Sequence, residues 1–200
     1  MTQPKRKGWK VAGWTIAAVA TVAVIAIVAV VAWLSVALSP NQEPTMNPNQ
    51  DSALEDQLRT KAPAEDALAQ YEAILQETAD GITGLVPELT WKWNRDPDFL
   101  DCTGEFAETR GVRVGTRNLL ASGPIPDNIW PAALQLVRDR AAELGASQEH
   151  VYADEPGHHD VAVYGDNGVE IRLMSRERAV LTATSGCHLK SADLSPAAES

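Results

Sequence analysis

The hydrophobic positions divide the chain into one long apolar segment and a following region of short periodic segments. Residues 11–38 contain no charged side chain, and at about 1.5 Å per residue they would form about 42 Å of helix. The hydrocarbon core of a bilayer is about 30 Å thick. The segment therefore predicts a single transmembrane helix. Tryptophans at 9, 14 and 33 lie near its two ends, where aromatic side chains favour the membrane interface.

The sequence on either side of this segment predicts its orientation. Residues 1–10 contain basic but no acidic side chains, which is typical of a cytoplasmic tail and places the C-terminal region outside the cytoplasm. The apolar core of a cleaved signal peptide spans only about 7–15 residues, so we expect an uncleaved signal anchor, with cleavage as the alternative. Residues 39–62 are rich in proline at their start and are expected to form an extracytoplasmic spacer, in which 51–62 could form a short helix.

Two later segments have the period of amphipathic helices. The first covers residues 63–85, and the positions on its apolar face are Ala67, Leu68, Tyr71, Ile74, Leu75, Thr78 and Ile82. The second is expected to begin at a cap on Asp127 or Asn128, to hold Pro131 in its first turn and to end at Gly145. Its apolar positions are Trp130, Ala133, Leu134, Val137, Ala141 and Leu144.

Short alternating or β-branched runs predict the strands. They cover residues 89–94, 111–120, 150–153, 160–164, 169–175 and 179–184, whereas 96–104 has the composition of a turn. The Asn167-Gly168 pair predicts a two-residue hairpin loop, which would pair Tyr164 with Ile171 and Val163 with Arg172. Tryptophans 91, 93 and 130 occupy strand and helix positions typical of a core, although exposed they could stack on a sugar or a partner.

The order of these elements predicts an α+β domain rather than a parallel α/β fold. We expect a mostly antiparallel sheet of about five to six strands with two helices packed on one face, preceded by the single transmembrane helix. The domain would cover residues 63–190, and residues 191–200 would form a flexible C-terminal tail.

Composition and motifs argue against several classes of function. The formal net charge of −10 argues against nucleic acid as a partner. His158, His159 and Asp160 are adjacent, but neighbouring strand residues point to opposite faces, so a turn entering a strand at the surface is favoured over a metal site. The run from Ser185 to His188 places a cysteine beside a histidine without the spacing of a known triad. We therefore predict no catalytic residue, no metal and no cofactor.

The two cysteines, Cys102 and Cys187, are expected to form a disulfide. An exported domain lies in an oxidising compartment, where a pair of cysteines favours one structural bridge. A redox-active pair is the alternative, and the absence of a CxxC motif disfavours it.

Several short motifs follow one another along the chain: Val86-Pro87, Thr90-Trp91-Lys92-Trp93, Cys102, Arg117, Gly145, Asp160-Val161, Asn167-Gly168 and Thr184-Ser185-Gly186-Cys187. In their order and spacing these motifs resemble the LppA-like mycobacterial lipoproteins. The resemblance covers about residues 65–190 and implies an exported domain at the outer face of an actinobacterial plasma membrane, with the two matching cysteines bridged. It implies no catalytic residue. Those lipoproteins carry a lipid on an N-terminal cysteine, which this chain lacks, so a transmembrane helix would replace the lipid.

These features favour a non-enzymatic, membrane-anchored module that binds an envelope protein or a small ligand outside the cytoplasm. One alternative is an envelope hydrolase that uses scattered carboxylates or histidines in an unrecognised site. Another is a carrier of a small ligand or lipid, with a cavity between helix 64–84 and the sheet. The lipid bilayer itself would be a partner through residues 11–38.

Overall fold

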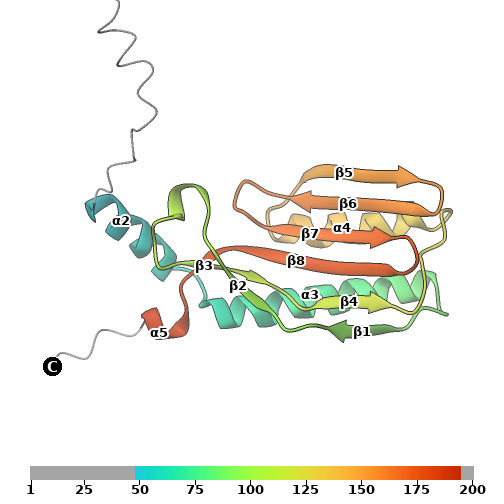
Figure 1. The fold of residues 1–200 in the computed structure, drawn as a ribbon, viewed down its shortest axis with the longest axis horizontal. Coiled ribbons are helices and arrows are strands. Elements are labelled where there is room, and N and C mark those ends of the chain that lie inside the picture. The colour runs from blue at the N-terminus through green and yellow to red at the C-terminus, as the bar shows by residue number, and fades with distance from the viewer. Residues whose placement is uncertain (1–47, 195–200) are drawn as a thin grey trace, which may run out of the picture. The chain divides into compact units, whose positions relative to one another are not determined.

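The structure, a computed structural model, describes residues 48–194 and contains an antiparallel sheet with two long helices on one of its faces (Figure 1). The strands are β1 (Trp91–Asn94), β2 (Asp98–Asp101), β3 (Val112–Gly115), β4 (Asn118–Ala121), β5 (Gln148–Glu155), β6 (His158–Tyr164), β7 (Glu170–Ser175) and β8 (Ala179–His188). The helical elements are α2 (Pro48–Arg59), α3 (Ala64–Leu85), the 3₁₀ turn η1 (Gly104–Phe106), α4 (Trp130–Glu143) and α5 (Ser191–Leu194). The predicted α+β class is confirmed.

The long strand β8 organises the sheet. The strand order is β1-β4-β8-β7-β6-β5, while β3 pairs with β8 beyond the end of β4 and β2 pairs with β3. The prediction of five to six strands was wrong, because the sheet has eight. The expected strand 111–120 is split into β3 and β4 at Thr116, whose hydroxyl exchanges hydrogen bonds with the Ala183 backbone (3.0 and 3.2 Å). The segment expected to be a turn contains β2.

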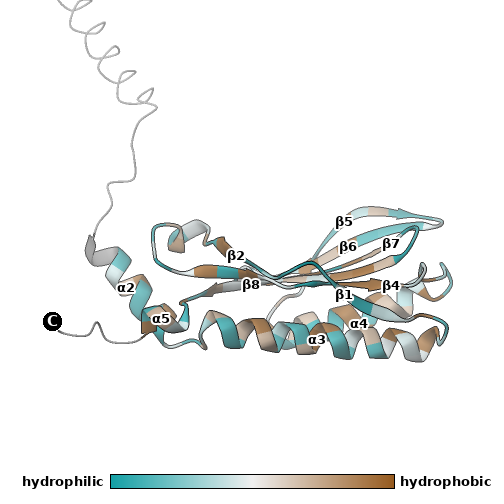
Figure 2. Cartoon of the chain, turned by 60° about the horizontal axis from the view of Figure 1, so that its bottom comes forward, coloured by the Kyte–Doolittle hydropathy of each residue, from teal (hydrophilic) through white to brown (hydrophobic). Residues whose placement is uncertain are grey.

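Both long helices lie on the same face of the sheet, as predicted, and the other face is open (Figure 2). Helix α3 packs on β8 and β3, and α4 packs on β6, β7 and α3. The predicted apolar face of α3 supplies Tyr71, Leu75 and Ile82 to the core at 5% exposure or less. Trp130 is also buried, while Trp91 and Trp93 pack against the core from one side of β1 and are partly buried.

The β6–β7 hairpin has a register one residue away from the predicted one. Val163 pairs with Ile171 and Tyr164 with Glu170. Gly165 accepts a hydrogen bond from the Gly168 N–H (3.0 Å), and Gly168 has φ +82°, which describes a three-residue loop rather than a two-residue one. Because one residue of slip exchanges the faces of a strand, Val163 and Ile171 both enter the core, whereas the predicted register would have paired Val163 with Arg172.

Both ends of the described chain pack on the domain. Helix α2 lies within the expected spacer, yet its Leu58 is fully buried. Leu58, Cys102, Cys187 and Leu189 form a small apolar cluster, with Phe106 and Leu194 packed against it. The first residue of the expected C-terminal tail, Ser191, donates hydrogen bonds from its N–H and hydroxyl to Glu65 (2.9 and 2.7 Å). The domain is therefore longer at both ends than the predicted residues 63–190.

No helix within residues 48–194 is both long enough and apolar enough to cross a membrane. The predicted transmembrane helix over residues 11–38 and the basic tail over residues 1–10 lie outside the described residues.

An ion pair joins α3 to the segment between β3 and β4. The Arg117 guanidinium donates to both carboxylate oxygens of Glu72 (2.7 and 2.8 Å) and lies 4.5 Å from the centre of the Trp93 ring. These hydrogen bonds hold the pKa of Glu72 below its usual value of 4.5. A carboxyl whose pKa is lowered in the folded state stabilises the protein above its unfolded pKa, and the effect is lost as the pH falls through the folded pKa.

We therefore expect Glu72→Gln to lower the free energy of unfolding at pH 7 by about 1 kcal/mol, because the pair is only partly shielded from water. The difference from wild type should close as the pH falls below 4.5, the ordinary pKa of this carboxyl. Urea unfolding at pH 7 and in acid measures it. Glu77→Gln, on the same helix as Glu72, removes an exposed pair with Arg140 of α4 and is the control with no expected effect. An equal loss at both pH values would contradict this account.

Candidate functional site

A groove on the open face of the sheet is the candidate site. It consists of two adjoining cavities of about 570 and 190 Å³ that share Arg113 and Gly168. We call it the Arg113 groove. It lies between the tip of the β6–β7 hairpin and the segment around η1, and its main lining side chains are Lys61, Phe106, Arg113, Tyr164, Glu170 and Thr184.

Glycine at position 186 allows the hairpin tip to form one wall of the groove. A Cβ atom at Gly186 would lie 2.4 Å from the Asn167 carbonyl oxygen, so only glycine lets the tip rest on β8. Tyr71 reaches the same point from the helical face through a hydrogen bond with the Gly186 backbone, while burial raises the pKa of its phenol to about 12. The tip is thus packed against a fixed point of the central strand.

The disulfide positions the opposite wall. Cys102 and Cys187 are bonded to each other across 85 residues of sequence, and Cys187 itself lines the groove. The residues directly after Cys102 form η1, which contributes Gly104, Glu105 and Phe106 to the lining. The bridge therefore ties this wall to the same strand on which the hairpin tip rests.

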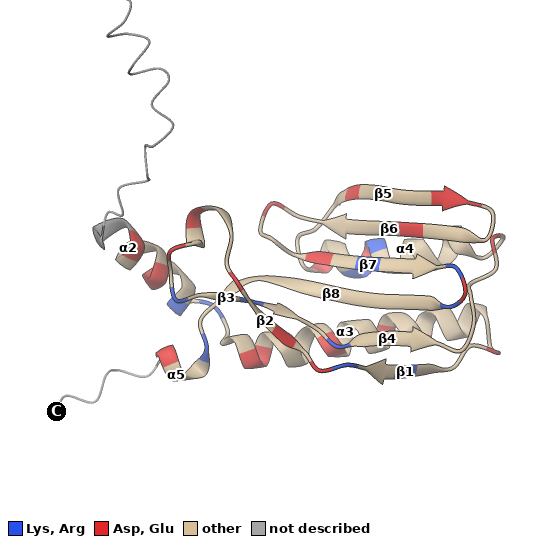
Figure 3. Cartoon of the chain, viewed as in Figure 1, with Lys and Arg blue, Asp and Glu red and all other residues tan. Residues whose placement is uncertain are grey.

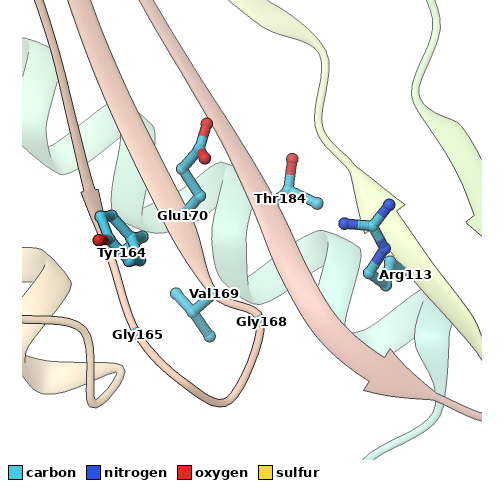
Figure 4. Close-up of a pocket in the computed structure, with 7 residues that line it drawn as sticks. All are labelled: Arg113, Tyr164, Gly165, Gly168, Val169, Glu170 and Thr184. Atoms are coloured by element: carbon cyan, nitrogen blue, oxygen red, sulfur yellow. The ribbon is translucent and has the colours of Figure 1, made fainter. Parts of the chain in front are cut away.

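Four polar side chains stand in a row across the floor of the smaller cavity (Figure 4). They are Tyr164 of β6, Glu170 of β7, Thr184 of β8 and Arg113 of β3. Glu170 is paired with Tyr164 on one side and with Thr184 on the other. The row therefore presents a carboxylate and a guanidinium on either side of a hydroxyl.

The basic groups of the groove donate hydrogen bonds to backbone carbonyls. The Arg113 Nε donates to the Asp101 carbonyl (3.2 Å), and the Lys61 ammonium donates to the Cys187 carbonyl (3.3 Å) and lies 5.4 Å from the Phe106 ring centre. Within residues 51–194, neither cation is within ion-pair distance of a carboxylate. The described part of the chain is otherwise rich in acidic residues, which occur on helices, strands and loops alike (Figure 3).

A second cavity, of about 270 Å³, lies over β1 and β4 and includes the basic residues Lys92 and Arg178. Both side chains are exposed, whereas Arg113 is half-buried. No acidic residue is part of its lining. The charged residues that line this cavity are all basic, whereas those of the Arg113 groove include both basic and acidic residues.

The structure corrects the interpretation of His159 as a surface residue. The residue is 7% exposed, and its ring is stacked on Trp130 at 4.6 Å between ring centres. Nδ1 lies 2.7 Å from Asp154 and Nε2 lies 3.1 Å from Asp127. Asp127 also accepts a hydrogen bond from the Gly157 N–H (2.9 Å), so it secures the β5–β6 turn and does not cap α4, which begins without a side-chain cap.

The contacts of His159 with Trp130, Asp127 and Asp154 are accounted for by a structural role. A ring whose two nitrogens both contact carboxylates has neither nitrogen free to accept a substrate proton, and the residues lining the Arg113 groove and the Lys92–Arg178 cavity do not include it. The hydrogen bond from Gly157 and the contact with His159 hold the pKa of Asp127 below its usual range. No set of three His, Cys, Asp or Glu among the described residues is placed to hold a metal ion.

The sequence motif at 185–188 does not form a nucleophilic site. Cys187 is in the disulfide, and the Ser185 hydroxyl is buried, accepting from the Val114 N–H (2.9 Å) and donating to the Gly186 carbonyl (2.7 Å). His188 contacts the Ala62 carbonyl (2.9 Å), and burial lowers its pKa. These residues instead form the central strand beneath the groove.

Comparison with known proteins identifies relatives over most of the chain. The LppA family, described as "Lipoprotein confined to pathogenic Mycobacterium", matches residues 39–191. LppA of Mycobacterium tuberculosis is 27% identical over 157 residues, which cover 76% of this chain and 71% of LppA. LppB of the same organism is 27% identical over 158 residues, with the same coverage of each chain.

The crystal structure of LppA from Mycobacterium tuberculosis is also similar. It superposes with a TM-score of 0.66 at 24% identity, covering 80% of this chain and 99% of the LppA chain. At this identity the likeness shows a shared fold, and it agrees with the α+β architecture described above.

Proposed function

Because this chain belongs to the LppA family, we propose that it is a membrane-anchored protein of the cell envelope whose domain binds a ligand through the Arg113 groove. The description of the family names a lipoprotein and no catalytic activity. The groove supports a binding role, since it combines a cavity of about 570 Å³ with half-buried and exposed charged side chains on fixed walls. It is the observation on which the proposal rests.

The proposed anchor is the uncharged segment 11–38, with residues 1–10 in the cytoplasm and the domain outside. Two features support this orientation. The basic residues are on the side of the segment that is favoured in the cytoplasm. The disulfide between Cys102 and Cys187 is of the kind that persists in an oxidising compartment and is rare in the cytosol.

A carrier function with an internal cavity is less well supported than surface binding. The space between α3 and the sheet contains buried side chains of both elements, among them Leu75, Ile82, Leu173 and Leu181 at 0% exposure. A hydrolase is also less well supported, because the histidine that contacts two carboxylates lies under Trp130. The open face of the sheet is the better candidate for contact with a ligand.

Proteolysis of spheroplasts tests the location of the domain. The full-length chain, with an epitope at its C-terminus, is produced in an actinobacterial host and treated with proteinase K before and after detergent lysis. We expect the epitope to be lost from intact spheroplasts while a cytoplasmic marker survives. Full protection of the epitope until lysis would place the domain in the cytoplasm and contradict the proposal.

A further inference from the structure

We infer that the Arg113 groove takes a zwitterionic small molecule, with a carboxylate or phosphate group on Arg113 and Lys61 and a cationic group on Glu170. This inference rests on the proposed function and specifies its ligand. It follows from the positions of the two charges on the open face of the sheet, from the lack of an ion pair for either of them within residues 51–194 and from the Phe106 ring beside Lys61.

The basic end of the groove has the geometry of an anion site. The hydrogen bond from Arg113 Nε to the Asp101 carbonyl orients the guanidinium, and its terminal nitrogens are suited to bidentate contact with a carboxylate or phosphate. Arg113 pairs with Cys187 across the β3–β8 ladder, and the Lys61 ammonium is bonded to the carbonyl of the same cysteine. Two cations thus surround one residue at the base of the cavity.

The acidic end lies on the same face, two strands away. Strands are spaced by about 4.8 Å, so the β7 and β3 backbones are about 10 Å apart. Glu170 is half-buried and, within residues 51–194, takes part in no ion pair. A cation that senses its charge is Arg172, whose pKa is raised mainly by the hydrogen bond with Asp160 and also by Glu170.

The Thr184 side chain stands between Glu170 and Arg113 (Figure 4). Glu170 pairs with Thr184 whereas Arg113 pairs with Cys187 further along β8, so the two charges are separated both across and along the strands.

The next row of the same sheet face shows the alternative arrangement. Arg172 lies two residues after Glu170 on β7, and its guanidinium donates to both carboxylate oxygens of Asp160 (2.6 and 2.7 Å). Arg172 and Asp160 therefore neutralise each other within the protein. Arg113 and Glu170 form no such pair with each other, so a ligand with one anionic and one cationic group could pair with both of them.

The surroundings limit the ligand further. Glu105 and Asp166 also line the larger cavity, and the chain has a net charge of −10, so a polyanion would be repelled. Phe106, whose ring centre lies 5.4 Å from the Lys61 ammonium, provides apolar contact at the basic end of the groove. These features favour a ligand with one anionic group, one cationic group and an apolar part next to the anionic group.

Calorimetric titration of the full-length chain in detergent micelles, at constant ionic strength, tests the inference with defined probes. The zwitterions are 4-(aminomethyl)benzoate and 4-(aminomethyl)phenylphosphonate, whose anionic groups distinguish a carboxylate from a phosphate-like ligand. The reference is 4-methylbenzoate, which keeps the ring and the anion and lacks the ammonium. We expect at least one zwitterion to bind at least about tenfold more tightly than the reference, as a charge-assisted hydrogen bond provides.

Three variants locate the binding. Arg113→Gln should weaken the zwitterion at least about tenfold, and Glu170→Gln should reduce its affinity to that of 4-methylbenzoate. Arg178→Gln, in the cavity over β1 and β4, is the matched control and should bind as wild type does. Near-ultraviolet circular dichroism verifies the fold of each variant, and Arg113→Lys, which retains the charge, should give an intermediate affinity.

The inference is overturned if neither zwitterion binds, if the zwitterions bind no better than 4-methylbenzoate, or if Arg178→Gln weakens binding and Arg113→Gln does not. Failure of the proposed location is distinguishable from these outcomes, because protection of the C-terminal epitope in spheroplasts does not depend on any probe.

Discussion

Replacing Cys102 and Cys187 together by alanine is expected to lower the free energy of unfolding by about 4–5 kcal/mol. The bridge closes a loop of 85 residues, and restricting a loop of this length in the unfolded chain accounts for a stabilisation of about that size. Domains of this kind are stable by about 5–15 kcal/mol in total. Alanine is chosen because both cysteines are buried in an apolar cluster, where a serine hydroxyl would add a cost of its own.

Urea unfolding of the full-length chain, followed by tryptophan fluorescence, measures the loss. Wild-type protein unfolded in the presence of a thiol reductant is the control and should match the double variant. The same change should weaken ligand binding in the groove, because η1 follows Cys102 directly and forms one wall. Two free thiols in the wild-type protein by mass spectrometry, or a double variant as stable as wild type, would contradict the structural role of the bridge.

Gly186→Ala is expected to destabilise the domain by about 1–3 kcal/mol, the usual cost of inserting a methyl group where no space exists. The new Cβ would lie 2.4 Å from the Asn167 carbonyl oxygen, which belongs to the backbone and cannot turn aside. The hairpin tip must therefore move away from β8. Because Asn167 and Gly168 line the groove, binding of the zwitterion should weaken as well.

Gly84→Ala is the matched control for this substitution. Gly84 lies near the end of α3 and a Cβ there would meet nothing within 4 Å. Alanine in a helix is favoured over glycine by about 0.5–1 kcal/mol, so this variant should be slightly more stable and should bind as wild type does. Thermal unfolding and calorimetry of both variants make the comparison. Equal stability of Gly186→Ala and wild type would show that the hairpin tip is not held by contact with β8.

Much of the helical layer is predictable from the sequence, because its signals are local and repeated. The apolar face of α3 recurs over several turns, and Tyr71, Leu75 and Ile82 are buried as that period predicts. The shared face of Trp91 and Trp93 follows from simple alternation along β1. In these elements, the local sequence preference and the pattern of buried positions predict the same secondary structure and the same buried face.

The strand details depend on contacts that the local pattern does not contain. Asn167-Gly168 is typical of a two-residue loop, but Gly165 and Gly168 close a three-residue loop instead. The core then receives Val163 opposite Ile171, which is a better buried pair than Val163 opposite Arg172. Strand β2 was missed because its acidic residues and exposed positions resemble a turn, and only pairing with β3 orders it.

The groove could not be identified from the sequence, since its members are ordinary residues brought together by the sheet. Arg113, Glu170 and Thr184 come from three strands and share no motif. The sequence feature that comes nearest to indicating the groove is Gly186, the glycine before Cys187. The need for glycine there is apparent only in the fold, where the hairpin tip packs against it. His159 was misplaced for a similar reason, because Asp127 and Trp130 lie about 30 residues earlier in the chain and cover it only in the fold.

Intermolecular nuclear Overhauser effects between a bound probe and the methyl groups of the full-length chain test the groove most directly. The protein carries labelled methyl groups in detergent micelles, and 4-(aminomethyl)benzoate is the probe. The account predicts contacts from the probe's ring protons to the methyl group of Thr184, which lines the groove. Contacts to the methyl groups of Leu120 in the cavity over β1 and β4 instead, or to neither residue, would contradict it.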